Sequence, residues 1–183
     1  MSKESTMSII RRRVTILLTA AMTMIIPLSA TAARAESTGA LATFEGQVID
    51  LSVSWGKARA CTSDGVTTQC FRTEAEMDRF TGNSTSAGRV GTMAACSSYL
   101  RLYRSTSYGG AVLQLATRYT YINLSLYGFD NDTSSYRVGA CPAYFYDGAN
   151  GGTPLYPGAT GANSSASTMV TGWDNRVSSI YIG

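Results

Sequence analysis

Hydrophobic and polar residues alternate over short stretches of the chain, a period-two pattern that is typical of β-strands with one buried face. In the first half, residues 48–60 (VIDLSVSWGKARA) predict one strand, and residues 66–71 predict a second strand that returns beside it. The intervening Thr62-Ser63-Asp64-Gly65 has the composition of a turn. A β-hairpin is therefore expected here, and it would bring Cys61 and Cys70 together across its end.

A helix is expected to follow this hairpin. Thr73 and Glu76 form a capping box, with Thr73 at the N-cap and Glu76 at the third helical position. The helix should run for about two turns, to Phe80. Residues 36–80 are thus predicted to form a small hairpin-plus-helix segment. This segment is either a stabilising subdomain or a pro-region or accessory module, with Arg89 as a processing point in the linker that follows.

Residues 1–35 have the pattern of a secretory signal peptide. Three arginines at residues 11–13 precede the largely apolar residues 14–30, and Ala33-Arg34-Ala35 supplies a small-x-small cleavage site. The apolar run is interrupted before it reaches the roughly 20 residues that a membrane span needs. We therefore expect cleavage before Glu36, a secreted, extracellular location, and no stable membrane insertion after cleavage.

Removal of this leader changes the charge of the chain. Five of the 15 Lys and Arg residues and one of the 12 Asp and Glu residues lie in residues 1–35, so ten basic and eleven acidic residues remain. The mature chain then has a net charge of about −1 and no basic patch, and nucleic acid is not expected as a partner.

Four cysteines follow the leader: Cys61, Cys70, Cys96 and Cys141. An even number in an exported chain predicts two disulfides, for which three pairings are possible. Zinc ligation is disfavoured, because the sequence contains no histidine and no C-x-x-C pair. The missing histidine also removes the usual general base of a serine or cysteine hydrolase, so we do not expect an enzyme.

The composition changes sharply in the middle of the chain. All 11 tyrosines lie between Tyr99 and Tyr181. Residues 81–95 (TGNSTSAGRVGTMAA) are small and polar, which is typical of a linker, and residues 96–183 are predicted to form the second domain. We expect most aromatic residues of this domain in its core rather than on a ligand-stacking surface.

The second domain contains an internal repeat. Residues 128–139 (GFDNDTSSYRVG) match residues 172–183 (GWDNRVSSIYIG) at a shift of 44. Upstream, residues 100–103 (LRLY) match residues 142–145 (PAYF) at a shift of 42, and each is followed by a Gly-rich hairpin turn. Short alternating strands between Gly, Asn, Asp and Ser turns predict an all-β sandwich or barrel.

This repeat resembles the Greek key of the βγ-crystallin superfamily, in particular its secreted, calcium-binding bacterial type. Residues 103–110 match the folded-hairpin signature of that family, and residues 145–152 give a weaker copy with Asn150 in place of an aromatic. Residues 130–135 and 174–179 both fit the calcium pattern [ND]-[ND]-x-x-[ST]-S. The resemblance covers residues 96–183 and implies a double Greek-key sandwich, preceded by the hairpin-plus-helix segment.

The same resemblance implies two calcium ions, held in a double clamp to which each acidic turn contributes ligands for both ions. Calcium is a hard cation that takes about six to eight oxygen ligands. Side-chain oxygen would come from Asn131, Ser134, Asn175 and Ser178, main-chain oxygen from Asp132 and Arg176, and negative charge from Asp130 and Asp174. The cationic side chain of Arg176 should weaken one site. A purely structural role for the turns is the alternative, because Asx side chains also satisfy turn amides.

The leading functional interpretation is a secreted calcium-binding β module stabilised by two disulfides, with Cys96 and Cys141 near the starts of the two repeats. The alternative is a secreted inhibitor of a metallopeptidase, because small exported inhibitors of that kind are similar in fold. Residues 148–168 would then supply a loop that contacts an extracellular protease, although ordinary loops share their Gly, Asn, Ser and Thr composition. Catalysis is disfavoured again, because Asp147 is the one acid of this domain outside the turns and has no obvious acid partner.

Overall fold

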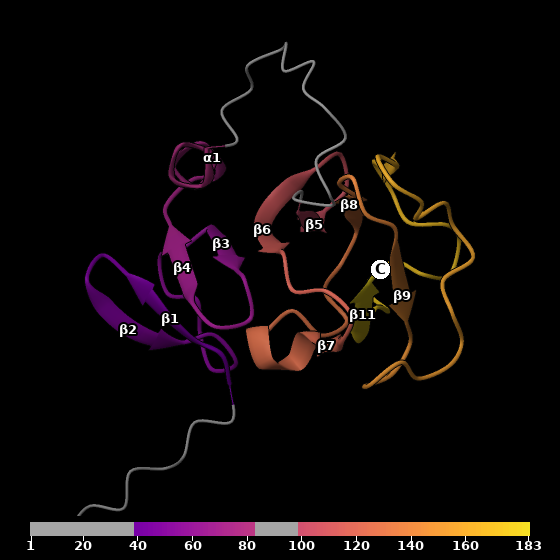
Figure 1. Ribbon diagram of the computed structural model, residues 1–183, viewed down its shortest axis with the longest axis horizontal. Helices are drawn as coiled ribbons and strands as arrows, with labels where there is room; N and C mark the ends of the chain where they lie inside the picture. The colour runs from indigo at the N-terminus through magenta and orange to yellow at the C-terminus, as the bar shows by residue number, and fades with distance from the viewer. Residues whose placement is uncertain (1–38, 83–98) are drawn as a thin grey trace, which may run out of the picture. The chain divides into compact units, whose positions relative to one another are not determined.

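The computed structural model describes residues 39–82 and 99–183 (Figure 1). The predicted signal peptide, most of the predicted linker and Cys96 lie outside the described residues. Within the two described ranges, no helix is both long enough and apolar enough to cross a membrane.

The described residues form eleven strands, one α-helix and one short 3-10 helix. In chain order they are β1 (Leu41–Phe44), β2 (Gln47–Asp50), β3 (Ala60–Ser63), β4 (Thr68–Phe71), α1 (Glu74–Thr81), β5 (Leu100–Ser105), β6 (Gly109–Leu115), β7 (Tyr121–Asn123), η1 (Leu124–Tyr127), β8 (Ser135–Arg137), β9 (Ala143–Tyr146), β10 (Ser165–Ala166) and β11 (Ser179–Ile182).

The strands form two sheets, between which the repeats exchange a strand. One sheet has the order β10-β8-β5-β6-β3-β4-β1-β2, and the other has the order β7-β11-β9. β7 of the first repeat pairs with β11 of the second, and β10 of the second repeat pairs with β8 of the first. Each repeat thus places its third strand in the sheet of the other, a Greek-key-like arrangement. The predicted fold class, mostly β with one helix ahead of a double Greek key, is confirmed.

The hairpin-plus-helix segment extends the larger sheet. β3 runs parallel to β6, with Ala60 opposite Val112 and Ser63 opposite Leu115. Figure 1 shows β3 and β4 continuing the sheet beyond β6. Residues on both sides of the predicted linker therefore share one continuous sheet and one compact unit.

The single strand predicted over residues 48–60 is wrong. β2 ends at Asp50, whose carboxylate accepts hydrogen bonds from the main-chain N–H and the hydroxyl of Ser52 and so turns the chain. Leu51 lies in the turn that follows and Trp55 in the loop after it, and they are 1% and 7% exposed. The alternation in the sequence reflects the burial of these loop side chains. Strand β1, which pairs with β2, was not predicted.

The predicted hairpin and its disulfide are confirmed for the strands β3 and β4. Cys61 and Cys70 lie opposite each other in the antiparallel register and form a disulfide bond. Because Cys96 lies outside the described residues, its pairing with Cys141 stays a prediction.

Helix α1 begins as the capping box predicts. The Thr73 hydroxyl accepts a hydrogen bond from the main-chain N–H of Glu76, whose side chain accepts one from the main-chain N–H of Thr73. The helix ends one residue later than expected, at Thr81, followed by Gly82 in a left-handed conformation. Arg101 of β5 contacts Glu74 and Asp78 of α1 through ion pairs, which fix the helix on the outer face of the larger sheet.

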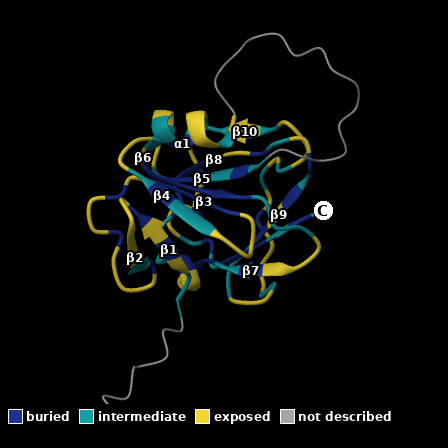
Figure 2. Cartoon of the chain, turned by 60° about the vertical axis from the view of Figure 1, so that its left-hand side comes forward, coloured by how far each residue is buried: buried dark blue, intermediate teal, exposed yellow. Residues whose placement is uncertain are grey.

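The interior between the sheets is rich in aromatic rings. Tyr136, Phe145, Tyr156 and Trp173 pack with ring centroids 4.9–5.8 Å apart, mostly edge to face. The buried positions are concentrated on β3, β5, β6 and β11, and Figure 2 shows exposed positions on β1, β7 and α1. The expectation that aromatic residues fill the core holds for these four residues, although several tyrosines lie at the surface.

Candidate functional site

The two repeats align in space at a shift of 43 in their first strands and hairpins, so the predicted shift of 42 is wrong by one residue. Equivalent hydrogen bonds join Ser134 N to Tyr103 O and Ser178 N to Tyr146 O, and likewise Ser135 Oγ to Ser105 O and Ser179 Oγ to Gly148 O. At the shift of 42, the sequence comparison aligned Tyr103 with Phe145. In the structure Phe145 is the counterpart of Leu102, and both are fully buried.

A glycine and a buried aromatic residue position each acidic turn. Gly128 and Gly172 adopt positive φ values of 59° and 81°, and the rings of Phe129 and Trp173 that follow them are buried in the core. The second residue of each turn, Asn131 or Asn175, also adopts the left-handed conformation, with φ of 53° and 54°. Asparagine is among the few residues with a side chain that tolerate this conformation. The asparagine of each turn is therefore favoured by the backbone conformation as well as by the oxygen that its side chain supplies.

The turns meet across an internal two-fold relation. The hydroxyl of Ser134 lies 3.3 Å from Oδ1 of Asn175, and the hydroxyl of Ser178 lies 3.2 Å from Oδ1 of Asn131. Main-chain hydrogen bonds run in parallel, from Asn131 N to Val177 O at 3.0 Å and from Asn175 N to Thr133 O at 3.1 Å. The second position of each turn therefore faces the fifth position of the other turn.

The spacing of these pairs is that of a hydrogen bond from a hydroxyl to an amide oxygen, and it is also compatible with two neighbouring ligands of a calcium ion. Two oxygens that bind one calcium at about 2.4 Å, in neighbouring coordination positions about 85–90° apart, lie about 3.2–3.4 Å from each other. Among the described residues there is no cluster of three or more carboxylate, thiolate or imidazole groups that could hold a metal. Ligation here would rest on amide, hydroxyl and main-chain oxygens, with Asp130 and Asp174 exposed beside them.

The third position of each turn carries an ion pair, and the two pairs have opposite polarity. Arg104 Nε lies 2.8 Å from Asp132 Oδ2, whereas Arg176 pairs with Asp147. At the shift of 43, the hairpin residue Arg104 is the counterpart of Asp147. In the turns, at a shift of 44, Asp132 is the counterpart of Arg176. The charges have therefore been exchanged between equivalent positions.

The environments of the two pairs also differ. Burial raises the pKa of Asp132 above its ordinary value, and the charge of Arg104 offsets this only in part. The Arg104 guanidinium also lies over the rings of Trp55 and Phe129, and it donates to the main-chain oxygen of Gly128. Arg104 therefore holds the first acidic turn against the N-terminal segment as well as neutralising Asp132.

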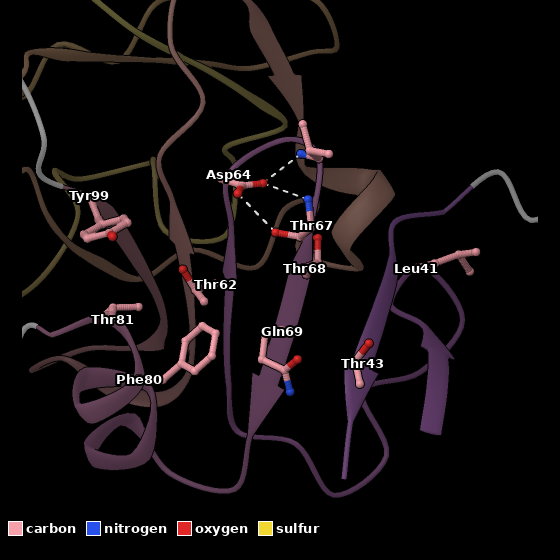
Figure 3. Close-up of a pocket in the computed structure, with 11 residues that line it drawn as sticks. Leu41, Thr43, Thr62, Asp64, Thr67, Thr68, Gln69, Phe80, Thr81 and Tyr99 are labelled. Carbon is pink, nitrogen blue, oxygen red and sulfur yellow. Dashed lines mark hydrogen bonds between the residues drawn. The ribbon is translucent and has the colours of Figure 1, made fainter. Parts of the chain in front are cut away.

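A separate cleft of 720 Å³ lies beside β1, β3 and β4 and the end of α1 (Figure 3). Hydroxyl groups of threonines, the amide of Gln69 and the rings of Phe80 and Tyr99 line it. Its carboxylate, Asp64, accepts hydrogen bonds from the N–H groups of Val66 and Thr67 and from the Thr67 hydroxyl, so it is committed to the turn. None of the predicted calcium residues lines this cleft within the described ranges.

The candidate inhibitory loop, residues 148–168, is anchored at several points. The main-chain oxygen of Thr160 accepts a hydrogen bond from Ala143 N, and that of Ser167 accepts one from Ser107 N. Tyr156 is buried, and its hydroxyl accepts a hydrogen bond from Val170 N. The loop is thus fixed to both sheets, and its inhibitory role stays a hypothesis.

Comparison with known proteins finds similarity at the level of solved structures. No family model matches the sequence, and no curated protein matches it. A βγ-crystallin from Ciona intestinalis is 21% identical, with 46% of this chain and 99% of that chain covered and a TM-score of 0.39. A βγ-crystallin domain from Flavobacterium johnsoniae is 26% identical, with 46% and 92% covered and a TM-score of 0.38. A βγ-crystallin from an archaeon is 19% identical, with 48% and 99% covered and a TM-score of 0.37. Over about half of its length, this chain is similar to βγ-crystallin domains.

Proposed function

We propose that this chain is an exported, non-catalytic β module that binds calcium between its two acidic turns and is stabilised by it. The observation that carries the proposal is the reciprocal pairing of Asn131 with Ser178 and of Asn175 with Ser134. Two oxygens from different turns face each other twice, at the separation that neighbouring calcium ligands have. The same two contacts are hydrogen bonds from the serine hydroxyls to the amide oxygens, so without an ion they still join the turns.

Each predicted ligand has a distinct task in this proposal. The amide oxygen of Asn131 and the hydroxyl of Ser178 hold one ion, and the amide oxygen of Asn175 and the hydroxyl of Ser134 hold the other. The main-chain oxygens of Asp132 and Arg176 complete the inner ligands, while Asp130 and Asp174 supply negative charge from the surface. Bound calcium would link the two repeats, because each ion takes oxygen from both.

Export accords with the chemistry of the site. A site with few carboxylates binds calcium weakly, in the range of about 10⁻⁴–10⁻³ M that is typical of extracellular modules. The disulfide between Cys61 and Cys70 requires an oxidising compartment as well. The predicted leader in residues 1–35 would deliver the chain to such a compartment.

Thermal unfolding in excess EDTA and in millimolar calcium, with disulfides intact, tests the proposal. In about 10 mM calcium, which is about 10–100 times a dissociation constant of about 10⁻⁴–10⁻³ M, a bound ion adds about 1.4–2.7 kcal/mol, which corresponds to roughly 3–11 °C for a domain of about 150 residues. The rise should vanish in the double variant Asn131→Gly/Asn175→Gly. Glycine removes the amide oxygens but keeps the left-handed backbone without strain.

Asn163 provides a matched control for these variants. It is an exposed asparagine with a φ of 60°, and it lies outside both turns. Asn163→Gly should keep the full response to calcium, whereas in EDTA the double variant is expected to melt lower than Asn163→Gly, because it also loses the hydrogen bonds from Ser134 and Ser178. An unchanged melting temperature of the parent chain in calcium would contradict the proposal.

A further inference from the structure

The outer face of the smaller sheet carries a row of tyrosines in register. Tyr181 of β11 lies opposite Tyr121 of β7 on one side and opposite Tyr144 of β9 on the other. Tyr146 lies two residues along β9 on the same face. Ring centroids are 5.4 Å apart for Tyr121 and Tyr181, 6.2 Å for Tyr144 and Tyr181, and 5.6 Å for Tyr121 and Tyr146. We call Tyr121, Tyr144, Tyr146 and Tyr181 the tyrosine platform.

This face is open, whereas the equivalent face of the larger sheet is covered. Tyr103 is the counterpart of Tyr146, and it is 1% exposed because α1 packs on it with Met77 and accepts its hydroxyl at Glu74. Tyr121 and Tyr144 remain 47% and 41% exposed. Since Ile122, Phe145 and Ile180 on the opposite face already fill the core, the platform is not required for packing between the sheets.

The rings are held in place before any ligand arrives. A Cβ atom at Gly151 would lie 2.4 Å from the Tyr121 ring, so the hairpin needs glycine there for the ring to lie against its backbone. Beside the ring, Asn123 and Asn150 hydrogen-bond to each other through their side chains at 2.9 Å. Fixed aromatic faces with amide and phenol groups around them are typical of a site that orients a polar ligand.

The side chains of the platform itself are neutral, and the cation at its edge, Arg118, donates to the main-chain oxygen of Gly183 beside Tyr144. The platform tyrosines carry phenols, and the two neighbouring asparagines carry amides. Burial and the neighbouring tyrosine hydroxyls raise the pKa of Tyr146. Its phenol, like any tyrosine near neutral pH, is protonated and can donate a hydrogen bond. Single-stranded nucleic acid also stacks on aromatic rings, but it needs a basic groove along its backbone. The predicted mature chain has a net charge of about −1, which disfavours such a polyanion.

A second copy of the chain is also disfavoured by the available area. Covering the exposed parts of Tyr121 and Tyr144 would remove roughly 130–220 Å² from water, since a whole aromatic side chain buries about 150–250 Å². A stable protein interface needs about 800 Å² per partner. The platform has the dimensions of a small ligand or of a few units of a chain.

We infer that the tyrosine platform binds a neutral glycan, with sugar rings stacked on the tyrosines and sugar hydroxyls bonded to the phenols and to the amides of Asn123 and Asn150. The C–H groups on one side of a pyranose ring suit the electron-rich faces of aromatic rings. The in-register row would let consecutive sugars of one chain occupy consecutive strands.

Affinity electrophoresis of the full-length chain, in native gels that contain hydroxyethylcellulose, glycol chitin or galactomannan, tests this inference. At least one neutral polysaccharide should retard the protein, and Tyr181→Ala should weaken binding by tenfold or more. Tyr144→Ala, at the edge strand, should weaken it several-fold without unfolding the chain. Tyr181→Phe should retain the larger part of the affinity, because it keeps the ring.

Phe80→Ala is the matched control, because Phe80 is a 63% exposed aromatic on α1 and should not affect retardation. The gels are run in EDTA and in calcium, and retardation is expected in both. The result can therefore be interpreted even if the calcium proposal fails. No retardation in any of the three gels would overturn the inference. So would equal retardation of Tyr181→Ala, or a platform that instead binds oligo-dT or drives self-association in sedimentation experiments.

Discussion

Ser134 Oγ lies 3.3 Å from Asn175 Oδ1, although 41 residues separate them in the chain. The same contact recurs between Ser178 and Asn131, so each turn provides an internal comparison for the other. Substitutions at equivalent positions can therefore be compared within one molecule, and differences between them report on the few places where the repeats diverge.

Because the two ion pairs have opposite polarity, the turn that carries Arg176 is expected to bind calcium more weakly than the turn that carries Asp132. A guanidinium about 6–8 Å from a divalent ion costs about 1 kcal/mol in water. Arg176→Gln should therefore tighten calcium binding about fivefold at low salt, and Asp132→Asn should weaken it by a similar factor. Calcium titrations at low and high ionic strength measure both effects, which should shrink as salt increases.

The ion pair between Arg72 and Glu45 supplies the control for this comparison. Both side chains are about half exposed and belong to the N-terminal segment. Arg72→Gln removes the same charge from the chain as Arg176→Gln, but it should leave calcium affinity unchanged. Equal effects of the two substitutions would mean that net charge, and not the position of Arg176, controls the affinity.

Thr133 tests whether a position of the first repeat accepts the residue found at the equivalent position of the second. Its hydroxyl is fully buried and has no hydrogen-bond partner among the described residues, whereas the counterpart of Thr133 in the second turn is Val177. Thr133→Val should stabilise the fold by about 1 kcal/mol in urea unfolding, because a buried polar group without a partner is removed at nearly constant volume. The reciprocal Val177→Thr should destabilise it by at least as much. A loss of stability in Thr133→Val would show that the hydroxyl has a partner.

Protonation of Asp64 is expected to account for part of the loss of folding stability at acidic pH. Hydrogen bonds from the main-chain N–H groups of Thr67 and Val66 hold the pKa of Asp64 below its ordinary value of 3.8. Its contribution to stability is therefore fully present above pH 3.8 and is lost as the pH falls through the lower folded-state pKa. Asp64→Asn keeps the turn but cannot ionise, so its stability should fall less between neutral and acidic pH. Parallel curves of melting temperature against pH would contradict this assignment.

Arg101 is predicted to hold helix α1 on the sheet. Its side chain is 15% exposed, and its guanidinium contacts Glu74 and Asp78 of the helix and the side chain of Gln114. Arg101→Met should cost about 2–3 kcal/mol in urea unfolding, because it leaves two carboxylates partly buried without a cation. It should also speed amide exchange in α1. Loss of the exposed pair between Arg72 and Glu45 in Arg72→Gln should cost much less than Arg101→Met, because solvent screens both charges.

Local signals in the sequence predicted the elements whose structure is decided locally. The capping box of Thr73 and Glu76, the turn near Asp64 and the opposed Cys61 and Cys70 all depend on residues a few positions apart. The acidic turns were also found, because asparagine at a left-handed position and a serine three residues later are repeated. Their partnership across the two-fold relation could be expected only through the resemblance to a known family.

Features that depend on tertiary contacts could not be predicted in this way. The alternation of residues 48–60 gave a false strand, because Leu51 and Trp55 reach the core from a loop. The parallel pairing of β3 with β6 joins segments on either side of the predicted linker, and no local pattern marks it. Alternation also shows that Tyr103 and Tyr146 point away from the core, but only the position of α1 decides that Tyr103 is covered.

The most direct test of the account is calorimetric titration of the full-length chain with calcium, beside the double variant Asn131→Gly/Asn175→Gly. The account predicts two ions for each parent chain and none for the variant, with both proteins folded in EDTA. Absence of binding in millimolar calcium, or equal binding by the parent and the variant, would contradict it and leave the paired turns as structural elements alone.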